Sequence, residues 1–133
     1  MKLLLDTHAL LWWMNEDARL EEHARAGIAD PRNAVLVSAV SLWEIALKVR
    51  IGKLEADVGE ILKAIEPEGF TPLGIDPQHL LALGRLPQHP EHRDPFDHLL
   101  IAQAIAEGAI FVTEDQASQR YPVQVMPCSD VRC

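Results

Sequence analysis

The sequence predicts an α/β sandwich built on a central, mostly parallel sheet. Two observations carry this prediction. Short strand-like runs alternate with segments of helical character, and glycine or proline ends several of the helical segments. No internal repeat or low-complexity stretch interrupts the alternation. The chain has 133 residues, which suits one domain over residues 1–133.

The first elements follow from a short apolar run and its neighbours. Residues 2–5 are strand-like and end at Asp6. Residues 7–14 and 17–27 have helical character, whereas Ala-Val-Leu-Val-Ser at 34–38 is rich in β-forming residues. We therefore expect the order strand, helix, helix, strand.

The middle of the chain contains two helical segments with clear stop signals. Residues 40–50 form the first, which Gly52 ends, and residues 57–66 form the second, which Pro67 ends. A third strand is expected over residues 70–75.

The last elements surround a loop that is rich in proline. Residues 77–84 predict a short helix, and residues 87–95 predict a loop. Residues 96–107 have apolar positions at helical spacing, and Gly108 is a stop signal. The final two strands are expected at 109–113 and 122–126.

The composition is that of a globular protein, and it weighs mildly against a nucleic-acid binder. The chain is 48% hydrophobic and 24% charged, with 20 acidic against 12 basic residues and a net charge of −8. Proteins that bind phosphate backbones usually carry basic patches. The objection weakens if several acids bind Mg²⁺, because the ion cancels negative charge where the acids gather.

The sequence contains no sign of export or of a membrane anchor. The longest apolar runs, such as 3–5 and 99–102, fall far short of the roughly 20 residues that span a bilayer. The apolar run at the N-terminus is too short for a secretory signal. Cys128 and Cys133 both lie in the tail and do not make a disulfide framework. We therefore expect a cytoplasmic protein.

Acidic residues follow the predicted strands. Asp6 ends the first strand and Asp115 comes just after the fourth, while Glu44 lies early in the helix after the second. Asp94 and Asp97 open the long helix that leads into the fourth strand. In open parallel sheets, ligands bind outside the carboxyl ends of the strands. These acids therefore form one candidate site, which Asp97 joins if its helix begins across that edge.

Carboxylates gathered at one point repel each other, so a cation must offset their charge. Mg²⁺ and Mn²⁺ prefer carboxylate oxygen and water, and bound Mg²⁺ activates water for phosphodiester cleavage. The histidines show no recognisable zinc spacing, and we expect His89 and His92, in the proline-rich loop, to lie at the surface. The pattern therefore favours a Mg²⁺ site over a zinc site.

Each acid also has a purely structural interpretation. Asp6 can cap the first helix, and Glu44 stands four residues before Lys48, the favourable order for an ion pair. Asp94 and Asp97 suit the start of a helix, and Asp115 suits a turn. These interpretations stay open, and they can coexist with metal binding.

Other residues are candidates for support or for packing. Thr113 and Ser41 can orient a carboxylate, and Lys48 or Arg93 can contact phosphate. We expect most of the three tryptophans to be buried rather than to stack on bases; they are Trp12, Trp13 and Trp43.

Competing α/β chemistries lack their sequence motifs. The phosphate-binding loop Gly-x4-Gly-Lys-Ser/Thr is absent, as is a Gly-x-Gly-x-x-Gly turn after the first strand. An aspartyl-phosphate phosphatase would need a second Asp where His8 stands, and no Gly-x-Ser-x-Gly elbow occurs. The acid cluster is thus the leading candidate.

Four segments together resemble the PIN domain family and, within it, the VapC-type toxins of bacterial toxin–antitoxin pairs. They are residues 3–12 from Leu3-Leu4-Leu5-Asp6 to Trp12, residues 38–48 around Trp43-Glu44, residues 92–104 with Arg93-Asp94-Pro95-Phe96-Asp97, and residues 111–115. Their order and spacing cover nearly the whole chain. His98 and Glu114 stand where the family more often has a basic or a small residue.

The resemblance implies a three-layer, PIN-like sandwich, usually homodimeric. It implies a Mg²⁺- or Mn²⁺-dependent ribonuclease whose acidic positions fall on Asp6, Glu44, Asp97 and Asp115, with Asp94 as an additional acid. It also implies a small antitoxin partner that blocks the active site. Two rivals stay open. One is a metal nuclease outside toxin–antitoxin biology, and the other is a non-catalytic module with a PIN-like fold.

Overall fold

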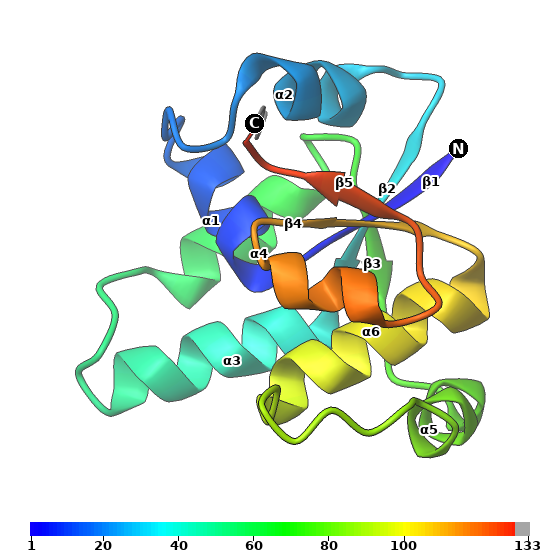
Figure 1. The fold of residues 1–133 in the computed structure, drawn as a ribbon. Coiled ribbons are helices and arrows are strands. Elements are labelled where there is room, and N and C mark those ends of the chain that lie inside the picture. The colour runs from blue at the N-terminus through cyan, green and yellow to red at the C-terminus, as the bar shows by residue number, and fades with distance from the viewer. Residues whose placement is uncertain (130–133) are drawn as a thin grey trace.

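The computed structural model describes residues 1–129 as a three-layer α/β sandwich (Figure 1). The strands are β1 (Lys2–Leu5), β2 (Ala34–Ser38), β3 (Thr71–Leu73), β4 (Ile110–Thr113) and β5 (Val125–Pro127). The helices are α1 (Thr7–Met14), α2 (Glu22–Ala29), α3 (Ala39–Arg50), α4 (Val58–Ile65), α5 (Pro77–Gly84) and α6 (Pro95–Glu107), with the 3-10 helix η1 (Gln116–Arg120). Cys133 lies outside the described residues.

The five strands form one sheet in the order β3-β2-β1-β4-β5, and every pairing between neighbours is parallel. β1 occupies the centre, where Leu4 pairs with Leu36 on one side and Phe111 on the other. A central parallel strand is buried on both faces, which explains its unbroken apolar sequence. The predicted fold class is thus confirmed, and the sheet carries its carboxyl ends along a single edge.

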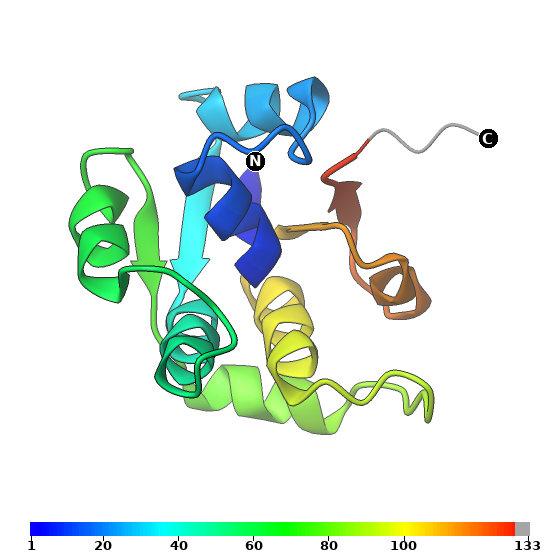
Figure 2. The same ribbon diagram turned by 90° about the vertical axis from the view of Figure 1, so that its left-hand side faces the viewer.

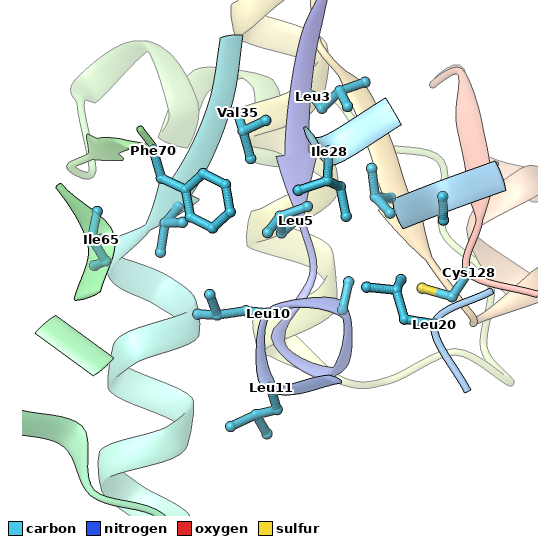
Figure 3. Packing of buried hydrophobic residues seen from close by; sticks show 14 of the residues in the cluster. Leu3, Leu5, Leu10, Leu11, Leu20, Ile28, Val35, Ile65, Phe70 and Cys128 are labelled. Carbon is cyan, nitrogen blue, oxygen red and sulfur yellow. The ribbon is translucent and has the colours of Figure 1, made fainter. Parts of the chain in front are cut away.

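Helices cover both faces of the sheet (Figures 1 and 2). On one face, Leu3 and Leu5 pack with residues of α1, α2 and α4, including Leu10, Ile28 and Ile65 (Figure 3). On the other face, Leu4, Leu36 and Phe111 pack against α6, and α5 lies against α6. Successive residues of β1 thus serve opposite cores, as the alternation of side chains along a strand requires.

Three elements differ from the prediction by more than one residue at an end. The helix expected at 17–27 begins only at Glu22, because Asp17 accepts hydrogen bonds from the backbone and guanidinium of Arg19 and holds a local turn. The third strand is limited to Thr71–Leu73, and the fifth begins at Val125 rather than at 122. η1 was not predicted; the side chain of Asp115 caps its first turn.

Two further observations concern the surface. Trp12 and Trp13 are partly buried, whereas Trp43 is 56% exposed and is the exception to the expected burial of most tryptophans. Trp43 and Leu47 in α3 and Ile51, the residue that follows the helix, stand at intervals of four, and all three are exposed. Across residues 1–129, no helix has the length and apolar character that crossing a membrane requires.

Candidate functional site

An acid-lined cleft of about 400 Å³ lies at the carboxyl edge of the sheet. The four acids that the family resemblance implies all line this cleft, and each comes from a different segment. Asp6 follows β1, Glu44 belongs to α3, Asp97 lies in the first turn of α6, and Asp115 follows β4. The lining also contains Asp94, Glu114 and Lys48. We call this feature the acid cleft. The start of α6 does lie across the sheet edge, which the sequence alone could not show.

Asp6 both caps a helix and faces the acid cleft. Its carboxylate accepts a 2.7 Å hydrogen bond from the backbone N–H of Ala9, and its own N–H donates to the carbonyl of Val112. Burial raises the pKa of Asp6 to about 6, and the negative charges of Glu44 and Asp115 act in the same direction. Hydrogen bonds from Thr113 and Ala9 partly oppose this shift. The structural interpretation of Asp6 therefore coexists with a place in the acid cluster.

Glu44 is buried, and two neighbours fix its carboxylate. The hydroxyl of Thr7 donates a 2.5 Å hydrogen bond to Oε1, and Nζ of Lys48 lies 2.8 Å from Oε2. The hydroxyl oxygen of Ser41 lies 3.2 Å from that of Thr7, so Ser41 reaches Glu44 through Thr7. Glu44 raises the pKa of Lys48 chiefly through this hydrogen bond. The predicted ion pair with Lys48 is thus present, and it lies inside the acid cleft.

At the start of α6, Asp94 caps the helix and Asp97 faces the acid cleft. The carboxylate of Asp94 caps the helix by accepting from the N–H groups of Phe96 and Asp97, and Pro95 occupies the first helical position. Burial, followed by the charge of Asp94, raises the pKa of Asp97 to about 7. The side chain of His92 opposes that shift. Asp94 thus positions the helix end from which Asp97 enters the cluster.

Asp115 reaches the acid cleft from the turn after β4. Its carboxylate accepts from the N–H of Ala117, and its own N–H donates to the hydroxyl of Thr113. Thr113 is buried and also hydrogen-bonds Asp6. Glu114 adds a further carboxylate to the cleft wall and accepts from the hydroxyl of Ser129. Thr113 therefore connects two of the four acids, as a supporting residue should.

His92 belongs to the site, and the expectation that it lies at the surface is wrong. Its side chain is 8% exposed, and Nε2 lies 3.4 Å from Oδ2 of Asp97 and 3.3 Å from Oδ2 of Asp115. Nδ1 lies 3.0 Å from the hydroxyl of Tyr121. Nε2 thus faces both carboxylates, while Nδ1 faces the hydroxyl of Tyr121. His92 opens the third of the segments that carry the family resemblance, but nothing in its sequence pattern indicated that its ring contacts Asp97 and Asp115.

The remaining candidates separate clearly. Lys48 lies in the acid cleft, but Arg93 is exposed, donates to the carbonyl of Pro90 and lines a different pocket. His8 and Trp12 form one wall of the acid cleft, with their ring centroids 5.7 Å apart. Of these two cationic residues, Lys48 is the one that lines the acid cleft.

The donor set suits a hard divalent cation. It is dominated by carboxylate oxygens, and burial raises the pKa of both Asp6 and Asp97 well above the ordinary value of 3.8. His92, Asp97 and Asp115 each offer a ligand atom, and those three atoms lie within 4.8 Å of one another. Such crowding is costly without a counter-ion, which a divalent cation among the oxygens would supply.

The protein is thus an α/β protein with an acidic candidate metal centre at the carboxyl edge of its parallel sheet. The family model of the PIN domain matches residues 3–123, so the chain belongs to the PIN domain family.

Two curated relatives come from Mycobacterium tuberculosis. Ribonuclease VapC22 is 30% identical over 124 residues, which cover 90% of this chain and 93% of the relative. Ribonuclease VapC16 is 40% identical over 58 residues, and that match covers 41% of either chain. The first match thus extends over nearly the full length of both proteins, whereas the second covers less than half of them.

Solved structures show the same fold. The VapBC2 structure from Rickettsia felis, bound to a promoter DNA fragment, contains a chain with a TM-score of 0.75 and 19% identity, covering 96% of this chain and 98% of that one. A chain of DNA-bound VapBC from Salmonella typhimurium has a TM-score of 0.67 and 17% identity, covering 97% and 99%. The predicted PIN-like sandwich is confirmed by both.

Proposed function

We propose that this chain is a divalent-metal-dependent endoribonuclease that hydrolyses RNA phosphodiesters. The observation that carries the proposal is the convergence of Asp6, Glu44, Asp97 and Asp115 in one cleft from four segments of the chain. Membership of the PIN domain family and the ribonuclease relatives support the same chemistry. The proposed cofactor is Mg²⁺, with Mn²⁺ as an alternative.

The four acids would coordinate the cation, and neighbouring residues of the site would fix the acids through hydrogen bonds and ion pairs. When bound, Mg²⁺ lowers the pKa of a coordinated water and stabilises charge on phosphoryl and leaving oxygens. Thr7 fixes one oxygen of Glu44, and Lys48 lies beside the other with a positive charge directed into the cleft. His92 would orient Asp97 and Asp115 together. Lys48 is the proposed contact for a substrate phosphate.

We further propose that the chain is the toxin of a toxin–antitoxin pair, with a small antitoxin as partner and a homodimer as its own assembly. The similar solved chains come from VapBC structures. The exposed apolar stripe Trp43, Leu47 and Ile51 supports assembly with protein, since apolar patches on soluble proteins often mark interfaces. Light scattering of the purified chain, alone and with the antitoxin, measures both assemblies.

The test of catalysis compares Asp6→Asn and Glu44→Gln with Glu55→Gln, a change at an exposed glutamate outside the acid cleft. We expect the first two variants to lose RNA cleavage in Mg²⁺ and still to unfold in one cooperative transition, while Glu55→Gln stays active. Cleavage by Asp6→Asn at the wild-type rate would remove the acid cleft as the active site. No cleavage and no Mg²⁺ or Mn²⁺ binding by the wild type would favour a non-catalytic module.

Cell experiments separate the toxin from a nuclease of RNA processing. We expect expression of the wild-type chain alone to arrest growth, and coexpression of a neighbouring antitoxin gene to restore it. Mapping the new RNA ends after brief induction would identify the target. Harmless expression of an active nuclease would contradict the toxin role and leave the ribonuclease chemistry intact.

A further inference from the structure

A second pocket, of about 560 Å³, lies between the C-terminal end of α5, the segment that follows it and Tyr121. Its volume falls in the range of about 300–1,000 Å³ that is usual for small-molecule sites. We call it the loop pocket. The lining residues that matter here are Gly84, Gln88, His89, His92, Arg93 and Tyr121.

His92 forms the wall between the loop pocket and the acid cleft. Its ring lines the loop pocket, while its Nε2 atom lies within 3.4 Å of Asp97 and Asp115, which line the acid cleft. A single side chain thus lines the loop pocket and contacts two acids of the acid cleft. A strand with a phosphate at the carboxylates would have a neighbouring base within reach of the loop pocket.

The lining of the loop pocket differs sharply from that of the acid cleft. The ring of His89 packs edge-on against Tyr121, with centroids 5.0 Å apart, and its side chain is 27% exposed. The exposed guanidinium of Arg93 lies at the same pocket. Imidazole rings and guanidinium planes are platforms on which unpaired RNA bases stack. Among the described residues that line this pocket, none is Asp or Glu.

We propose that the loop pocket binds a nucleobase of the RNA strand next to the phosphate that is cleaved, an inference that rests on the proposed ribonuclease function. The ring of His89 and the guanidinium of Arg93 supply planar surfaces. The amide of Gln88 both donates and accepts hydrogen bonds, as the edges of bases do. The pocket would thus select which base flanks the cut.

A protein partner is the competing occupant, and two observations favour RNA. The loop pocket is a compact hollow lined by both apolar side chains and hydrogen-bonding groups, whereas a partner helix would need a long apolar groove. It also adjoins the cleft proposed to hold phosphate. A base therefore matches both its shape and its position.

Gly84 allows the pocket to be filled without moving the backbone. It lines the loop pocket at the end of α5, and a Cβ atom built there meets nothing within 4 Å. Gly84→Phe would therefore place a ring in the space meant for a base. Gly74→Phe is the matched control, because Gly74 is equally open but lies outside the pocket.

The assay measures RNA binding separately from cleavage. Fluorescence anisotropy in Ca²⁺ gives Kd values for labelled oligoadenylate, oligouridylate and oligocytidylate, and for an abasic ribose-phosphate chain of equal length. Stacking predicts that the wild type binds at least one base-bearing strand about tenfold more tightly than the abasic chain. Gly84→Phe should abolish that preference, whereas Gly74→Phe should keep it.

Three results would overturn the proposal. They are equal wild-type affinity for base-bearing and abasic strands, an unchanged preference in Gly84→Phe, and a Gly84→Phe variant that loses only its antitoxin complex. The last result would assign the pocket to the protein partner. Cleavage in Mg²⁺ is measured in parallel on the wild type, so failure of the ribonuclease function would appear there and not in the base preference.

Discussion

The Nε2 atom of His92 lies 3.3 Å from Oδ2 of Asp115, and the loop that carries His92 is fastened to the helix that Asp115 caps. Glu91 pairs with Arg120, and His89 contacts the carbonyl oxygen of Arg120. The segment before α6 and the turn after β4 are thus held as one unit. The position of His92 between Asp97 and Asp115 is a consequence of this fastening.

His92→Ala should reduce RNA cleavage without removing the metal site. The four acids remain, but Asp97 and Asp115 lose the N–H group that orients both. Loss of such a supporting partner typically costs about 10- to 100-fold in activity or metal affinity. Initial cleavage rates and Mg²⁺ titration calorimetry measure the two effects.

Two variants accompany His92→Ala. Tyr121→Phe removes only the hydroxyl contact to Nδ1 and should show a smaller loss of the same kind. His23→Ala, at an exposed histidine of α2, is the control and should cleave normally. Wild-type cleavage by His92→Ala would show that the two carboxylates need no such support.

Without metal, the protein should lose stability as pH rises from 5 to 8. The folded-state pKa values of Asp6, about 6, and Asp97, about 7, lie above the ordinary value of 3.8. The folded state therefore binds protons more tightly than the unfolded state, and stability falls as pH passes through the folded pKa values. The loss should be on the order of a few kcal/mol and complete above pH 7.

Metal should reverse this trend, because ionised carboxylates bind it best. Thermal unfolding in EDTA and in Mg²⁺, across pH 5 to 8, measures both slopes. The lowered pKa values of Asp17 and Asp30, about 2, act below this window. The double variant Asp6→Asn/Asp97→Asn should flatten the metal-free slope. A metal-free melting temperature that rises with pH and is insensitive to both substitutions would contradict the assignment.

Lys48→Met should weaken the metal-free fold and strengthen Mg²⁺ binding. Lys48 lies 2.8 Å from Oε2 of the buried Glu44, so it neutralises that carboxylate but also competes with a cation for it. Leaving a buried charged group without its partner costs about 1–3 kcal/mol, and the exposure of Lys48 places this case at the lower end. Urea unfolding in EDTA and calorimetry with Mg²⁺ measure the two effects.

Lys53→Met is the matched control, since Lys53 is exposed and lies outside the acid cleft. It should change neither quantity. If Lys48→Met weakens Mg²⁺ binding, the lysine holds Glu44 in place for the cation rather than competing with it.

Much of this site could be predicted from the sequence because the ends of the strands are marked by the change from apolar to acidic residues. Asp6 and Asp115 follow apolar strand-like runs, and parallel strands bring their carboxyl ends to one edge. The capping roles of Asp6 and Asp94 were predictable from helix-start patterns and are present. Placing Asp97 in the same cleft needed the family resemblance, because local patterns do not say where a helix begins in space.

His92 escaped prediction for a physical reason. Its burial depends on contacts between the loop after α5 and η1, two segments distant in sequence and without periodic pattern. Arg93, the next residue of the same loop, is exposed and does not line the acid cleft. Adjacent residues in an irregular loop can thus differ in burial and in the groups they contact, and neither periodicity nor spacing reveals how. The extent of the domain over residues 1–133 stays a prediction, which a single cooperative unfolding transition would support.

Thr7→Val should impair cleavage while Thr7→Ser should not. Valine keeps the shape of threonine but removes the hydroxyl that donates a 2.5 Å hydrogen bond to Glu44 and lies beside Ser41. Glu44 would then keep only Lys48 as a fixed partner, and its free oxygen would face a buried surrounding. We expect about a tenfold loss of cleavage and of Mg²⁺ affinity in Thr7→Val, because supporting partners of ligating carboxylates have effects of this size.

The serine variant makes this prediction specific. Thr7→Ser restores the hydroxyl and loses only a methyl group, so its cleavage rate should stay close to that of the wild type. Equal losses in the two variants would show that the methyl group and its packing matter more than the hydrogen bond. Equal, wild-type activity in both would mean that Lys48 alone suffices to hold Glu44 in the acid cleft.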